Sequence, residues 1–576
     1  MEMKYSNDRA TQILLSLLKS HGIKKVIASP GTTNISLVGS IQYDKWFEVY
    51  SSVDERSAAY MACGMAAATG ETVVITCTGA TASRNYLPGL TEAFYRKLPV
   101  LAITGSHGDE VVGHLHAQSV DRTQTPRDTV RMSVTVDRID TPKDEWATIV
   151  NVNKALLELR HHGGGPVHIN LRLGHGAGFT TEELPATRVI LRYMFDDIFP
   201  DIKAGRVALF IGAHRPFDDT LTLAIDKFCS SYNAVVFCDI TSGYNGKFKL
   251  QHTFLACQHN YSGNLFAPDL LIHLGEVSGE FYVTNQLKPK QTWRISEDGE
   301  VKDLFGSLTA VFEMQDITFF DHFANDTMTN CEYLTACQNQ ITELASQLLE
   351  LPFGNIWIAQ QLHDKLPNGC IFHTSILNSL RSWNFYDIDP SIQTSCNVGG
   401  FGIDGPISTL LGSSLAKPDV LHLAVVGDLA FFYDLNSLGN RHVGKNLRIL
   451  LINNGRGAEF SNYDHPASQW GEEADAYMAA GGHYGRQSKT LIKHYAEDLG
   501  FEYISASSKD EFQSVCSKFV NPKVTNKPLV FEVFTSHEDE SEAIMSMRTI
   551  IKQPDPTIQE RIVYKAKRII NKLINN

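Results

Sequence analysis

The sequence predicts an α/β protein made of three doubly wound domains, each built on a parallel sheet. Short runs rich in valine and isoleucine alternate with helical stretches, and most residues of these runs are apolar. Strands of that kind are buried on both faces, which is typical of parallel sheets covered by helices. Each run also ends in Gly, Ser, Thr or Asp, so we expect ligands at the carboxyl edges of the sheets.

The first predicted domain covers residues 1–185. We expect helices at 8–21, 56–69 and 85–96. We expect strands within the segments IKKVIASPG (23–31), TVVITCTG (72–79), PVLAITGSHG (99–108) and PVHINLRLG (166–174). This alternation predicts a sheet with helices on both faces.

Two further domains and a tail follow. The pattern loosens around 185–200 and resumes in a central domain, 195–345, with strands in RVALFIGAH (206–214), AVVFCDIT (234–241) and DLLIHLGEV (269–277). The third domain, 350–545, carries CIFHTS (370–375), VLHLAVVGD (420–428), LRILLINN (447–454) and LVFEVFT (529–535). Residues 546–576 read as a basic amphipathic helical tail, for which a solvated surface helix is a simpler interpretation than partner binding.

Composition narrows the function classes. The chain has 576 residues, too many for one hydrophobic core, and a net charge of −13, which disfavours nucleic acid and anionic membrane surfaces as partners. Its ten cysteines form no CxxC pair and no cluster with zinc spacing, which indicates reduced thiols. The N-terminal residues look like an amphipathic helix rather than a signal peptide, and no run of about 18 apolar residues occurs, so we expect a cytoplasmic protein.

Two polar pairs at neighbouring strand ends predict a metal site. Gly427 and Asp428 follow one buried strand, and Asn453 and Asn454 follow the next, with Asp428 and Asn454 26 residues apart. A carboxylate and a carboxamide offer the hard oxygen ligands that suit Mg²⁺, which usually bridges to a phosphate. Ordinary turn chemistry is the alternative interpretation.

The segment 425–460 resembles the diphosphate-binding motif of thiamine-diphosphate-dependent enzymes, in which GD is followed after about two dozen residues by NN. DERSAAYMACGMAAATG (54–70) resembles the other half of that active site. Within this superfamily of 2-oxo acid decarboxylases and carboligases, the chain is most similar to the SEPHCHC synthases of menaquinone biosynthesis. The matching pieces are SPGTTNISL (29–37), CTGATASRNYLPGLTEAFY (77–95), NVGGFGIDGPISTLLG (397–412) and GDLAFFYDLNSL (427–438).

This resemblance implies thiamine diphosphate and Mg²⁺ as cofactors, and it implies a catalytic role for Glu55. In the similar enzymes a carboxylate at this place bonds the pyrimidine ring and promotes the proton shift that activates the coenzyme. On the sequence alone, Glu55 could instead pair with Arg56 or cap the helix that begins near Ser57. Glu55 is predicted within an apolar strand and helix pairing, where a carboxylate is costly. On the sequence alone the cap is the favoured interpretation, and the matching motif at 425–460 makes the catalytic role the stronger one.

The resemblance also assigns the metal and coenzyme contacts. Asp428 and Asn454 supply side-chain oxygens to Mg²⁺, and the backbone carbonyl of Arg456 completes the set. Ile403 takes the place of the residue that wedges between the coenzyme rings, although it could be an ordinary core isoleucine. The other implied coenzyme contacts are Pro30, Gly31, Thr78, Asn85, Ser375, Gly402, Asp404, Gly427, Leu429, Ala430 and Gly457. Because the two halves of the site come from different subunits in this superfamily, a homodimer or homotetramer is implied.

The chain departs from the synthases where they bind substrate. Those enzymes hold isochorismate and 2-oxoglutarate with arginines, whose places are taken here by Thr33, His107, Ser379 and Val398. Arg381 could replace one of them only if the register slipped. Each lost charged hydrogen bond costs about 1.5–3 kcal/mol, so we do not expect the synthase reaction itself.

A histidine-rich lining replaces these arginines. His107, His114, His116 and Gln118 come from one segment, HGDEVVGHLHAQ (107–118), which could be a strand or a loop. We expect His107, His116 and Gln118 to act in catalysis, with surface or structural histidines as the alternative. Two further sets of residues are expected at the site: His373 and Ser375 at a strand end, and His483 in a lid at AAGGHYGRQSK (479–489).

The sequence thus predicts decarboxylation of a small 2-oxo acid such as pyruvate, with carboligation to a carbonyl or enone acceptor, for example a nucleotide-linked keto sugar. Simple decarboxylation is one alternative, and a non-catalytic relative that keeps only the fold is another. The central domain shows no clean GxGxxG between 200 and 345, so the sequence gives no prediction about a ligand there.

Overall fold

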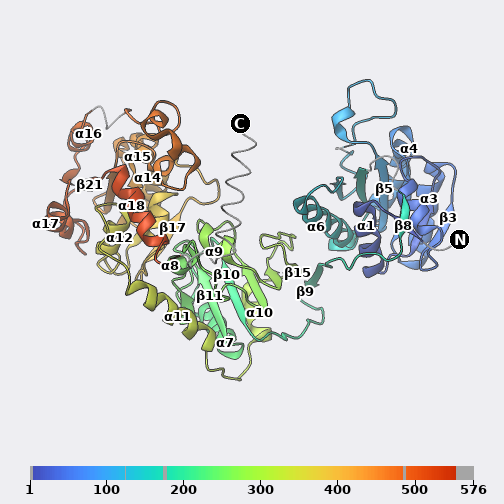
Figure 1. The fold of residues 1–576 in the computed structure, drawn as a ribbon, viewed down its shortest axis with the longest axis horizontal. Coiled ribbons are helices and arrows are strands. Elements are labelled where there is room, and N and C mark those ends of the chain that lie inside the picture. The colour runs from blue at the N-terminus through green and yellow to red at the C-terminus, as the bar shows by residue number, and fades with distance from the viewer. Residues whose placement is uncertain (1–3, 123–124, 173–177, 484–487, 553–576) are drawn as a thin grey trace, which may run out of the picture. The chain divides into compact units, whose positions relative to one another are not determined.

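The computed structural model describes residues 4–122, 125–172, 178–483 and 488–552. It divides into two compact units, Met1–Phe199 with Glu297–Glu313, and Pro200–Ser296 with Met314–Asn576. Parallel sheets flanked by helices recur along the chain, which confirms the predicted α/β fold (Figure 1). No described helix is both long enough and apolar enough to cross a membrane.

The first unit contains a six-stranded parallel sheet in the order β3-β2-β4-β5-β7-β6. Its strands are β2 (Lys25–Ala28), β3 (Glu48–Ser51), β4 (Val73–Cys77), β5 (Val100–Ser106), β6 (Met132–Val136) and β7 (Val167–Arg172). Its helices are α1 (Arg9–Ser20), α2 (Ile35–Ile41), α3 (Glu55–Thr69), α4 (Ala80–Asn85), α5 (Leu87–Tyr95) and α6 (Pro142–Glu158). Smaller pairs are formed by β1 (Tyr5–Ser6) with β8 (Phe179–Thr181), and by β9 (Leu191–Met194) with β15 (Leu308–Glu313).

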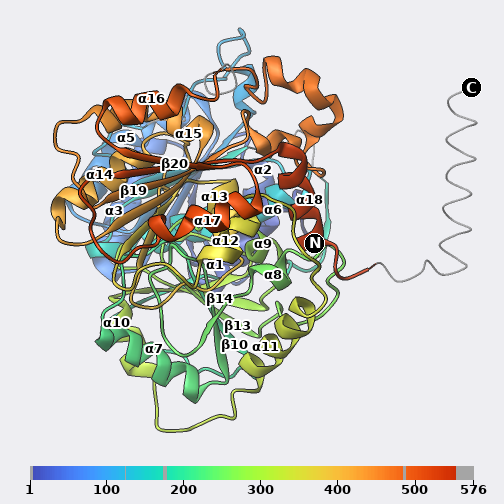
Figure 2. The ribbon, with the colours of Figure 1, turned by 90° about the vertical axis from the view of Figure 1, so that its left-hand side faces the viewer.

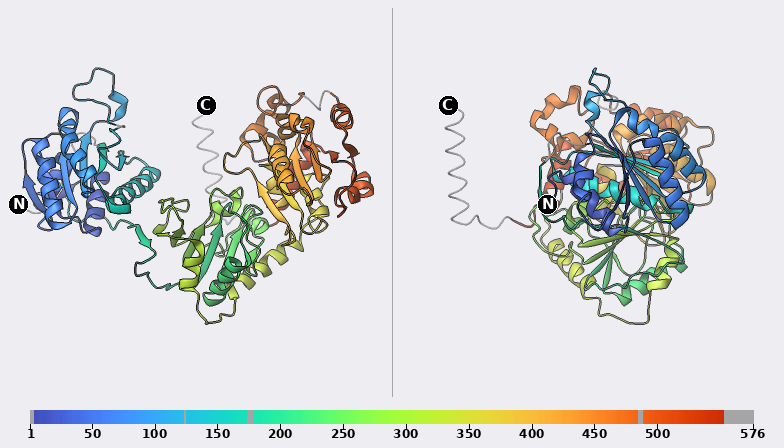
Figure 3. Two further views of the ribbon diagram at one scale, coloured as in Figure 1. Left: turned by 180° about the vertical axis from the view of Figure 1, so that it is seen from behind. Right: turned by 90° about the vertical axis from the view of Figure 1, so that its right-hand side faces the viewer.

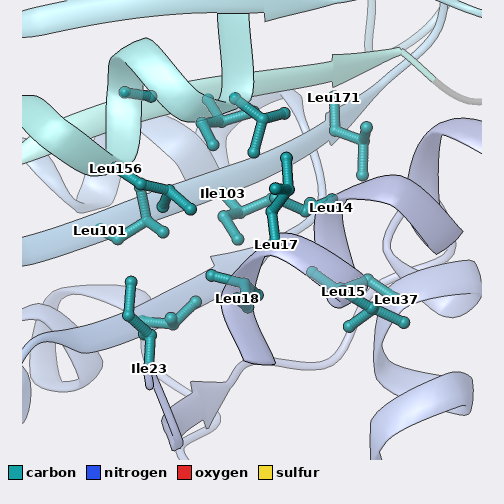
Figure 4. Close-up of a cluster of buried hydrophobic side chains, with 14 of the residues drawn as sticks. Leu14, Leu15, Leu17, Leu18, Ile23, Leu37, Leu101, Ile103, Leu156 and Leu171 are labelled. Atoms are coloured by element: carbon teal, nitrogen blue, oxygen red, sulfur yellow. The ribbon is translucent and has the colours of Figure 1, made fainter. Parts of the chain in front are cut away.

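Two hydrophobic cores sandwich this sheet, because successive strand residues point to opposite faces. On β5, Leu101 and Ile103 pack with α1, α2 and α6, where Leu14, Leu17 and Leu156 are buried (Figure 4). Val100 and Ala102 of the same strand pack with α3, α4 and α5 on the other face. Figure 3 shows helices on both sides of this sheet.

The second unit contains two sheets. One runs β12-β11-β10-β13-β14 and comprises β10 (Val207–Ile211), β11 (Ala234–Cys238), β12 (Lys249–Leu250), β13 (Leu270–Leu274) and β14 (Gln291–Ile295). Its helices are α7 (Asp219–Ser231), α8 (Thr253–Ala256), α9 (Phe281–Gln286), α10 (Asp316–Phe323) and α11 (Glu332–Ala345).

The other sheet is parallel and runs β17-β16-β18-β19-β21-β20. Its strands are β16 (Ile371–Thr374), β17 (Gln393–Cys396), β18 (His422–Gly427), β19 (Leu447–Asn453), β20 (Glu502–Ala506) and β21 (Leu529–Phe534). Its helices lie on both faces (Figure 2) and are α12 (Asn355–Leu362), α13 (Asn378–Trp383), α14 (Pro406–Ala416), α15 (Asp428–Tyr433), α16 (Leu491–Asp498), α17 (Lys509–Phe519) and α18 (His537–Arg548). Of the predicted tail, residues 553–576 lie outside the described part.

Every strand segment that the sequence predicted contains a strand. The mostly buried strands β14 and β15 were missed, and so were exposed or polar edge strands. β3 is exposed along its whole length, and β17 has the polar sequence QTSC. An edge strand borders only one neighbour and is less buried, so it lacks the continuous apolar run used for prediction.

Both six-stranded sheets share one feature that positions ligands. In the first unit, the chain goes from β2 outward to β3 and then returns to β4 on the other side of β2. In the second unit, the chain goes from β16 to β17 and returns to β18 in the same way. The loops that follow β2 and β4, and those that follow β16 and β18, therefore diverge and leave a crevice at the carboxyl edge.

Candidate active site

A cavity of about 230 Å³ lies at the carboxyl edge between β16, β18 and β19. It brings together nine of the predicted coenzyme contacts: Ser375, Ile403, Gly427, Asp428, Leu429, Ala430, Asn454, Arg456 and Gly457. Ser375 follows β16 and Gly427 ends β18, and the Gly427 amide lies 3.5 Å from the Ser375 hydroxyl oxygen. The cavity thus occupies the crevice that the strand order creates.

Asp428 is the most constrained acid of this cavity. Its side chain is only 5% exposed, and its two oxygens accept hydrogen bonds from the amides of Leu429 (2.8 Å) and Gly455 (2.7 Å). Burial raises the pKa of the carboxyl to about 7, against the effect of these amides. Within the described residues Asp428 has no ion-pair partner, so a bound divalent cation would restore its charged form.

Asn454 and Arg456 follow the neighbouring strand. The Asn454 side-chain oxygen accepts a hydrogen bond from the Arg456 amide at 3.3 Å. The buried Arg456 guanidinium pairs with Asp475 at 2.7 Å, so it is already neutralised. A carboxylate, a carboxamide and a nearby backbone carbonyl at one strand edge match the oxygen ligands of Mg²⁺, and the Ser375 hydroxyl adds a donor for a phosphate. These residues fit a magnesium diphosphate group.

Ile403 combines both interpretations that the sequence left open. It packs against the core around α14 and α15, and it also lines the cavity. Its neighbours Gly402 and Asp404 are not among the residues that line the cavity, and Asp404 is exposed.

The first unit holds the other predicted contacts at its own crevice. The Thr33 hydroxyl lies 2.6 Å from that of Thr78 and donates to the Gly105 carbonyl at 2.8 Å. A Cβ on Gly31 would lie 2.5 Å from the Thr78 Cβ, so only glycine fits this approach. The side chain of Thr33, which takes the place of an expected arginine, therefore contacts the neighbouring loop and strand. Pro30 beside it is exposed.

Glu55 is the first residue of α3 and is half-buried, rather than enclosed in an apolar pairing as the sequence suggested. The first helical turn tolerates a carboxylate because the helix dipole is positive there. The cap is Asp54, whose side chain accepts from the amides of Arg56 (2.8 Å) and Ser57 (3.2 Å), and Arg56 pairs with Asp54. The Asn85 amide donates to Glu55 at 3.2 Å. Both alternative roles considered for Glu55 thus belong to Asp54.

The histidine segment is a loop. A 3-10 helix at Asp109–Val111 is followed by turns, and Leu115 and Gln118 have positive φ. His107 and His116 line a cavity of about 770 Å³ together with Glu110, Asp137, Arg138 and Arg172. His114 and Gln118 are exposed and are not among its lining residues, so this structure does not bring Gln118 to the same cavity.

Of the two polar residues expected at the end of β16, Ser375 lines the 230 Å³ cavity and His373 does not. His373 is only 1% exposed, its Nδ1 lies 2.9 Å from the Ser395 hydroxyl, and burial lowers its pKa to about 4. It is an interior residue of β16 and not a lining residue of the 230 Å³ cavity, because the alternation along the strand turns it into the sheet packing. Ser379 lines that cavity and Val398 is buried.

Arg381 is already engaged. Its guanidinium makes a two-point ion pair with Glu459 (2.8 and 2.9 Å), a hydrogen bond to Asn378 (2.8 Å) and a cation–π contact with Phe281. Burial opposes its charge, but Glu459 outweighs that effect and the pKa of Arg381 is raised. In this arrangement the charge of Arg381 is taken up by Glu459 rather than left for a substrate.

Sequence reasoning missed Glu459 and Asn355, which also line the 230 Å³ cavity. Glu459 lies 78 residues from Arg381, and nothing in the local sequence of either residue indicates the pair. For the predicted lid, residues 484–487 lie outside the described part; His483 is exposed, and the Ala479 carbonyl accepts from the Gly457 amide at 2.6 Å.

Comparisons with known proteins agree with this geometry. Residues 8–125 match the family "Thiamine pyrophosphate enzyme, N-terminal TPP binding domain". The chain is 31% identical to the 2-succinyl-5-enolpyruvyl-6-hydroxy-3-cyclohexene-1-carboxylate synthase of Bacteroides fragilis over 559 residues, which cover 92% of this chain and 97% of the relative. It is 30% identical to the synthase of Bacteroides thetaiotaomicron (95% and 100% covered) and 29% identical to that of Phocaeicola vulgatus (93% and 97% covered).

Proposed function

Because this chain belongs to the thiamine-pyrophosphate-dependent enzyme family that contains these synthases, we propose that it decarboxylates a small 2-oxo acid such as pyruvate and transfers the acyl group to a carbonyl or enone acceptor. The observation that carries the proposal is the buried Asp428 beside Asn454 in a switch-point cavity. Such a buried acid is costly unless a cation compensates it.

Each residue has a role in this proposal. Asp428 and Asn454 would hold Mg²⁺ through side-chain oxygens, and the backbone carbonyl of Arg456 would be a third ligand. Glu55, oriented by Asn85, holds a proton at the pyrimidine ring of thiamine diphosphate. When bound, the coenzyme supplies the electron sink for loss of CO₂. Ile403 supports the coenzyme from the apolar wall of the cavity.

A neutral, hydroxyl-bearing acceptor, for example a nucleotide-linked keto sugar, fits the substrate side best. Thr33 has an uncharged side chain, and the Arg381 guanidinium is paired with Glu459, so neither offers an unpaired cation to a substrate carboxylate. His107 and His116 line the 770 Å³ cavity and would exchange protons with, or hydrogen-bond, the acceptor. Simple decarboxylation is the outcome if no acceptor binds.

A second candidate is the reaction named in the relatives, 2-succinyl-5-enolpyruvyl-6-hydroxy-3-cyclohexene-1-carboxylate synthesis. It is favoured by 31% identity that extends over 97% of the Bacteroides fragilis synthase. The positions of Thr33 and Arg381 weigh against it.

The deciding experiment measures CO₂ release from a panel of 2-oxo acids with thiamine diphosphate and Mg²⁺ present. Release from pyruvate, with the [2-¹⁴C] label recovered in a product larger than acetaldehyde when candidate acceptors are added, supports carboligation. Label in acetaldehyde alone would indicate simple decarboxylation. Release only from 2-oxoglutarate with isochorismate would establish the second candidate instead.

Glu55→Gln tests whether the fold is catalytic. We expect coenzyme binding to remain and turnover to fall on the order of 100-fold or more, because glutamine cannot hold the proton in the same way. Glu48→Gln, a change at an exposed residue of β3, is the matched control. Coenzyme C2 proton exchange that is equal in Glu55→Gln and the wild type would refute the role of Glu55 and favour a non-catalytic relative.

The proposal includes assembly and location. The two halves of the site lie in separate units of one chain, and we propose that they meet across the interface of a homodimer or homotetramer. All ten cysteines are free thiols, which fits the reducing cytoplasm.

A further inference from the structure

Two adjacent histidines and a glutamate form a cluster in the first unit that the proposed reaction does not use. His161 Nε2 lies 2.9 Å from Glu313 Oε2, and His162 Nε2 lies 2.8 Å from Glu313 Oε1. One candidate ligand atom from each of the three residues lies within 4.8 Å of the other two. The histidines sit between α6 and β7, so they are at the amino edge of the parallel sheet, opposite the edge that carries Thr33 and Thr78.

Glu158 fixes the orientation of one histidine. Its Oε2 lies 3.0 Å from His161 Nδ1, and its Oε1 is held by Arg131 Nε at 3.1 Å. A carboxylate at Nδ1 places the proton there and leaves a lone pair on Nε2. In a neutral His161, that lone pair would face the Glu313 carboxylate at 2.9 Å, which is repulsive unless a proton or a cation lies between them.

The cluster is compact and mostly enclosed. The two imidazole rings lie with their centroids 3.9 Å apart, and the Arg192 guanidinium is 3.7 Å from Glu313, whose side chain is largely buried. One cation shared by the two imidazoles and Glu313 would use a nitrogen of each histidine and a carboxylate oxygen as ligands.

The backbone is shaped to present both side chains to one carboxylate. His162 has φ 46° and ψ 51°, a left-handed conformation that is rare for a residue with a side chain, and Gly163 and Gly164 continue with positive φ. Strained backbone of this kind clusters at active sites and ligand clamps. In a regular helix or strand, neighbouring side chains would point in different directions.

We propose that His161, His162 and Glu313 bind one divalent transition-metal ion of the zinc class, with Glu158 as the positioning residue for His161. Zinc bonds of about 2.0–2.2 Å place tetrahedral ligand atoms about 3.3–3.5 Å apart. The two histidine–carboxylate distances of 2.8 and 2.9 Å must therefore widen, and any pair of ligand atoms near the 4.8 Å limit must close, when an ion binds. A cavity of about 360 Å³ adjoins the histidines and leaves room for water on the open side of the ion. The ion would join the α6–β7 loop to the end of β15. This strand belongs to residues 297–313, the later stretch of chain that is part of the first unit.

The test uses the full-length protein, treated with a chelator and then loaded with thiamine diphosphate and Mg²⁺. Calorimetric titration should show one equivalent of Zn²⁺ bound per chain. His162→Ala and Glu313→Gln should each weaken the Zn²⁺ affinity by about 10- to 100-fold or more. Glu158→Gln should weaken it less, because it removes only the orientation of His161. His494→Ala, a change at an exposed residue of α16, is the matched control and should bind as the wild type does.

Co²⁺ substitution identifies the ligands without relying on the stability of a variant. The wild type should show d–d bands of a nitrogen and oxygen site and no thiolate charge-transfer band, which the free cysteines would produce if they were the ligands. Less than a tenth of an equivalent of Zn²⁺ bound at micromolar concentration, a thiolate band, or unchanged binding in His162→Ala would each overturn the proposal. The cluster would then be a network of hydrogen-bonded ion pairs.

Discussion

The fold treats the two acids of the proposed active site differently. Asp428 is the buried first residue of α15, and its carboxylate accepts hydrogen bonds from two backbone amides. Glu55 is the half-buried first residue of α3, and its carboxylate contacts Asn85. A fixed, desolvated carboxylate suits the binding of a cation. A more accessible carboxylate suits a group that must meet a coenzyme held by other residues.

Asp428→Asn tests the metal role at the residue scale. Asparagine keeps one acceptor oxygen for the Leu429 or Gly455 amide but loses the charge, so the fold should persist while the cation loses a ligand. We expect Mg²⁺-dependent binding of thiamine diphosphate to weaken on the order of 100-fold, or about 3 kcal/mol. Fluorescence titration measures it, and Asp419→Asn at an exposed position is the control. Equal affinity in both variants would show that Asp428 is not a metal ligand.

At the scale of elements, the crevice of the first unit depends on loops that touch through glycine. A Cβ on Gly105 of β5 would lie 2.1 Å from the Thr33 carbonyl oxygen, so the loop after β2 must move if any side chain is added. Gly105→Ala should destabilise the protein by about 1–3 kcal/mol, or displace that loop and weaken coenzyme binding.

Gly64→Ala is the matched comparison for that prediction. Gly64 lies inside α3, and a Cβ there meets no atom within 4 Å. Alanine should therefore keep or raise the stability, by up to about 1 kcal/mol, because glycine disfavours helices. Thermal unfolding of both variants checks the pair. A Gly105→Ala variant as stable and as tight for the coenzyme as Gly64→Ala would contradict the close approach of the loops.

The cap of α9 makes a pH-dependent contribution to stability. Glu280 caps this helix by accepting from the Tyr282 and Val283 amides, and burial raises the pKa of its carboxyl from 4.5 to about 7. The folded state therefore keeps a proton that the unfolded chain releases between these two values, so stability falls as the pH rises through that window. The loss at completion is about 3 kcal/mol.

Glu280→Gln should remove this part of the pH dependence. Glutamine is isosteric and keeps an acceptor for the amide of Tyr282, but it cannot ionise. Relative to the wild type, the variant should become progressively more stable from pH 4.5 to above pH 7. Urea unfolding at a series of pH values measures the difference, and a difference that is constant with pH would contradict the buried, titrating carboxyl.

At the scale of the whole molecule, the central question is which chains build one active site. Glu55 belongs to the first unit and Asp428 to the second. If each site combines the Glu55 of one chain with the Asp428 of another, a chain with Glu55→Gln and a chain with Asp428→Asn complement each other. A mixed dimer then contains one intact site and one doubly altered site.

Co-expression of the two inactive variants tests this arrangement. Random pairing makes half of the dimers mixed, and half of the sites in a mixed dimer are intact, so about a quarter of the wild-type activity should return. Each variant expressed alone is the control and should stay inactive. No recovery in purified mixed dimers would place both acids of a site in the same chain.

The sequence alone determined the α/β class and most of the buried strands, and it led to the prediction of a metal site at Asp428 and Asn454. Uninterrupted apolar runs such as those in β18 and β19 arise only where both faces of a strand are buried, so their pattern is local and readable. The polar residues directly after these strands, Asp428 and Asn454, inherit their positions from the strand ends. That is why they could be assigned to one cavity.

The tertiary structure alone decided the contacts between residues distant in the chain. Arg381 could have been a substrate cation until Glu459 was found 2.8 Å from it, and His373 could have lined the site until β17 was found to bury it. The meeting of His161 and His162 with Glu313 is of the same kind. Sequence patterns report whether a side chain is buried, because burial follows the period of its own element. They do not report which partner it meets, because that depends on the order in which the strands assemble.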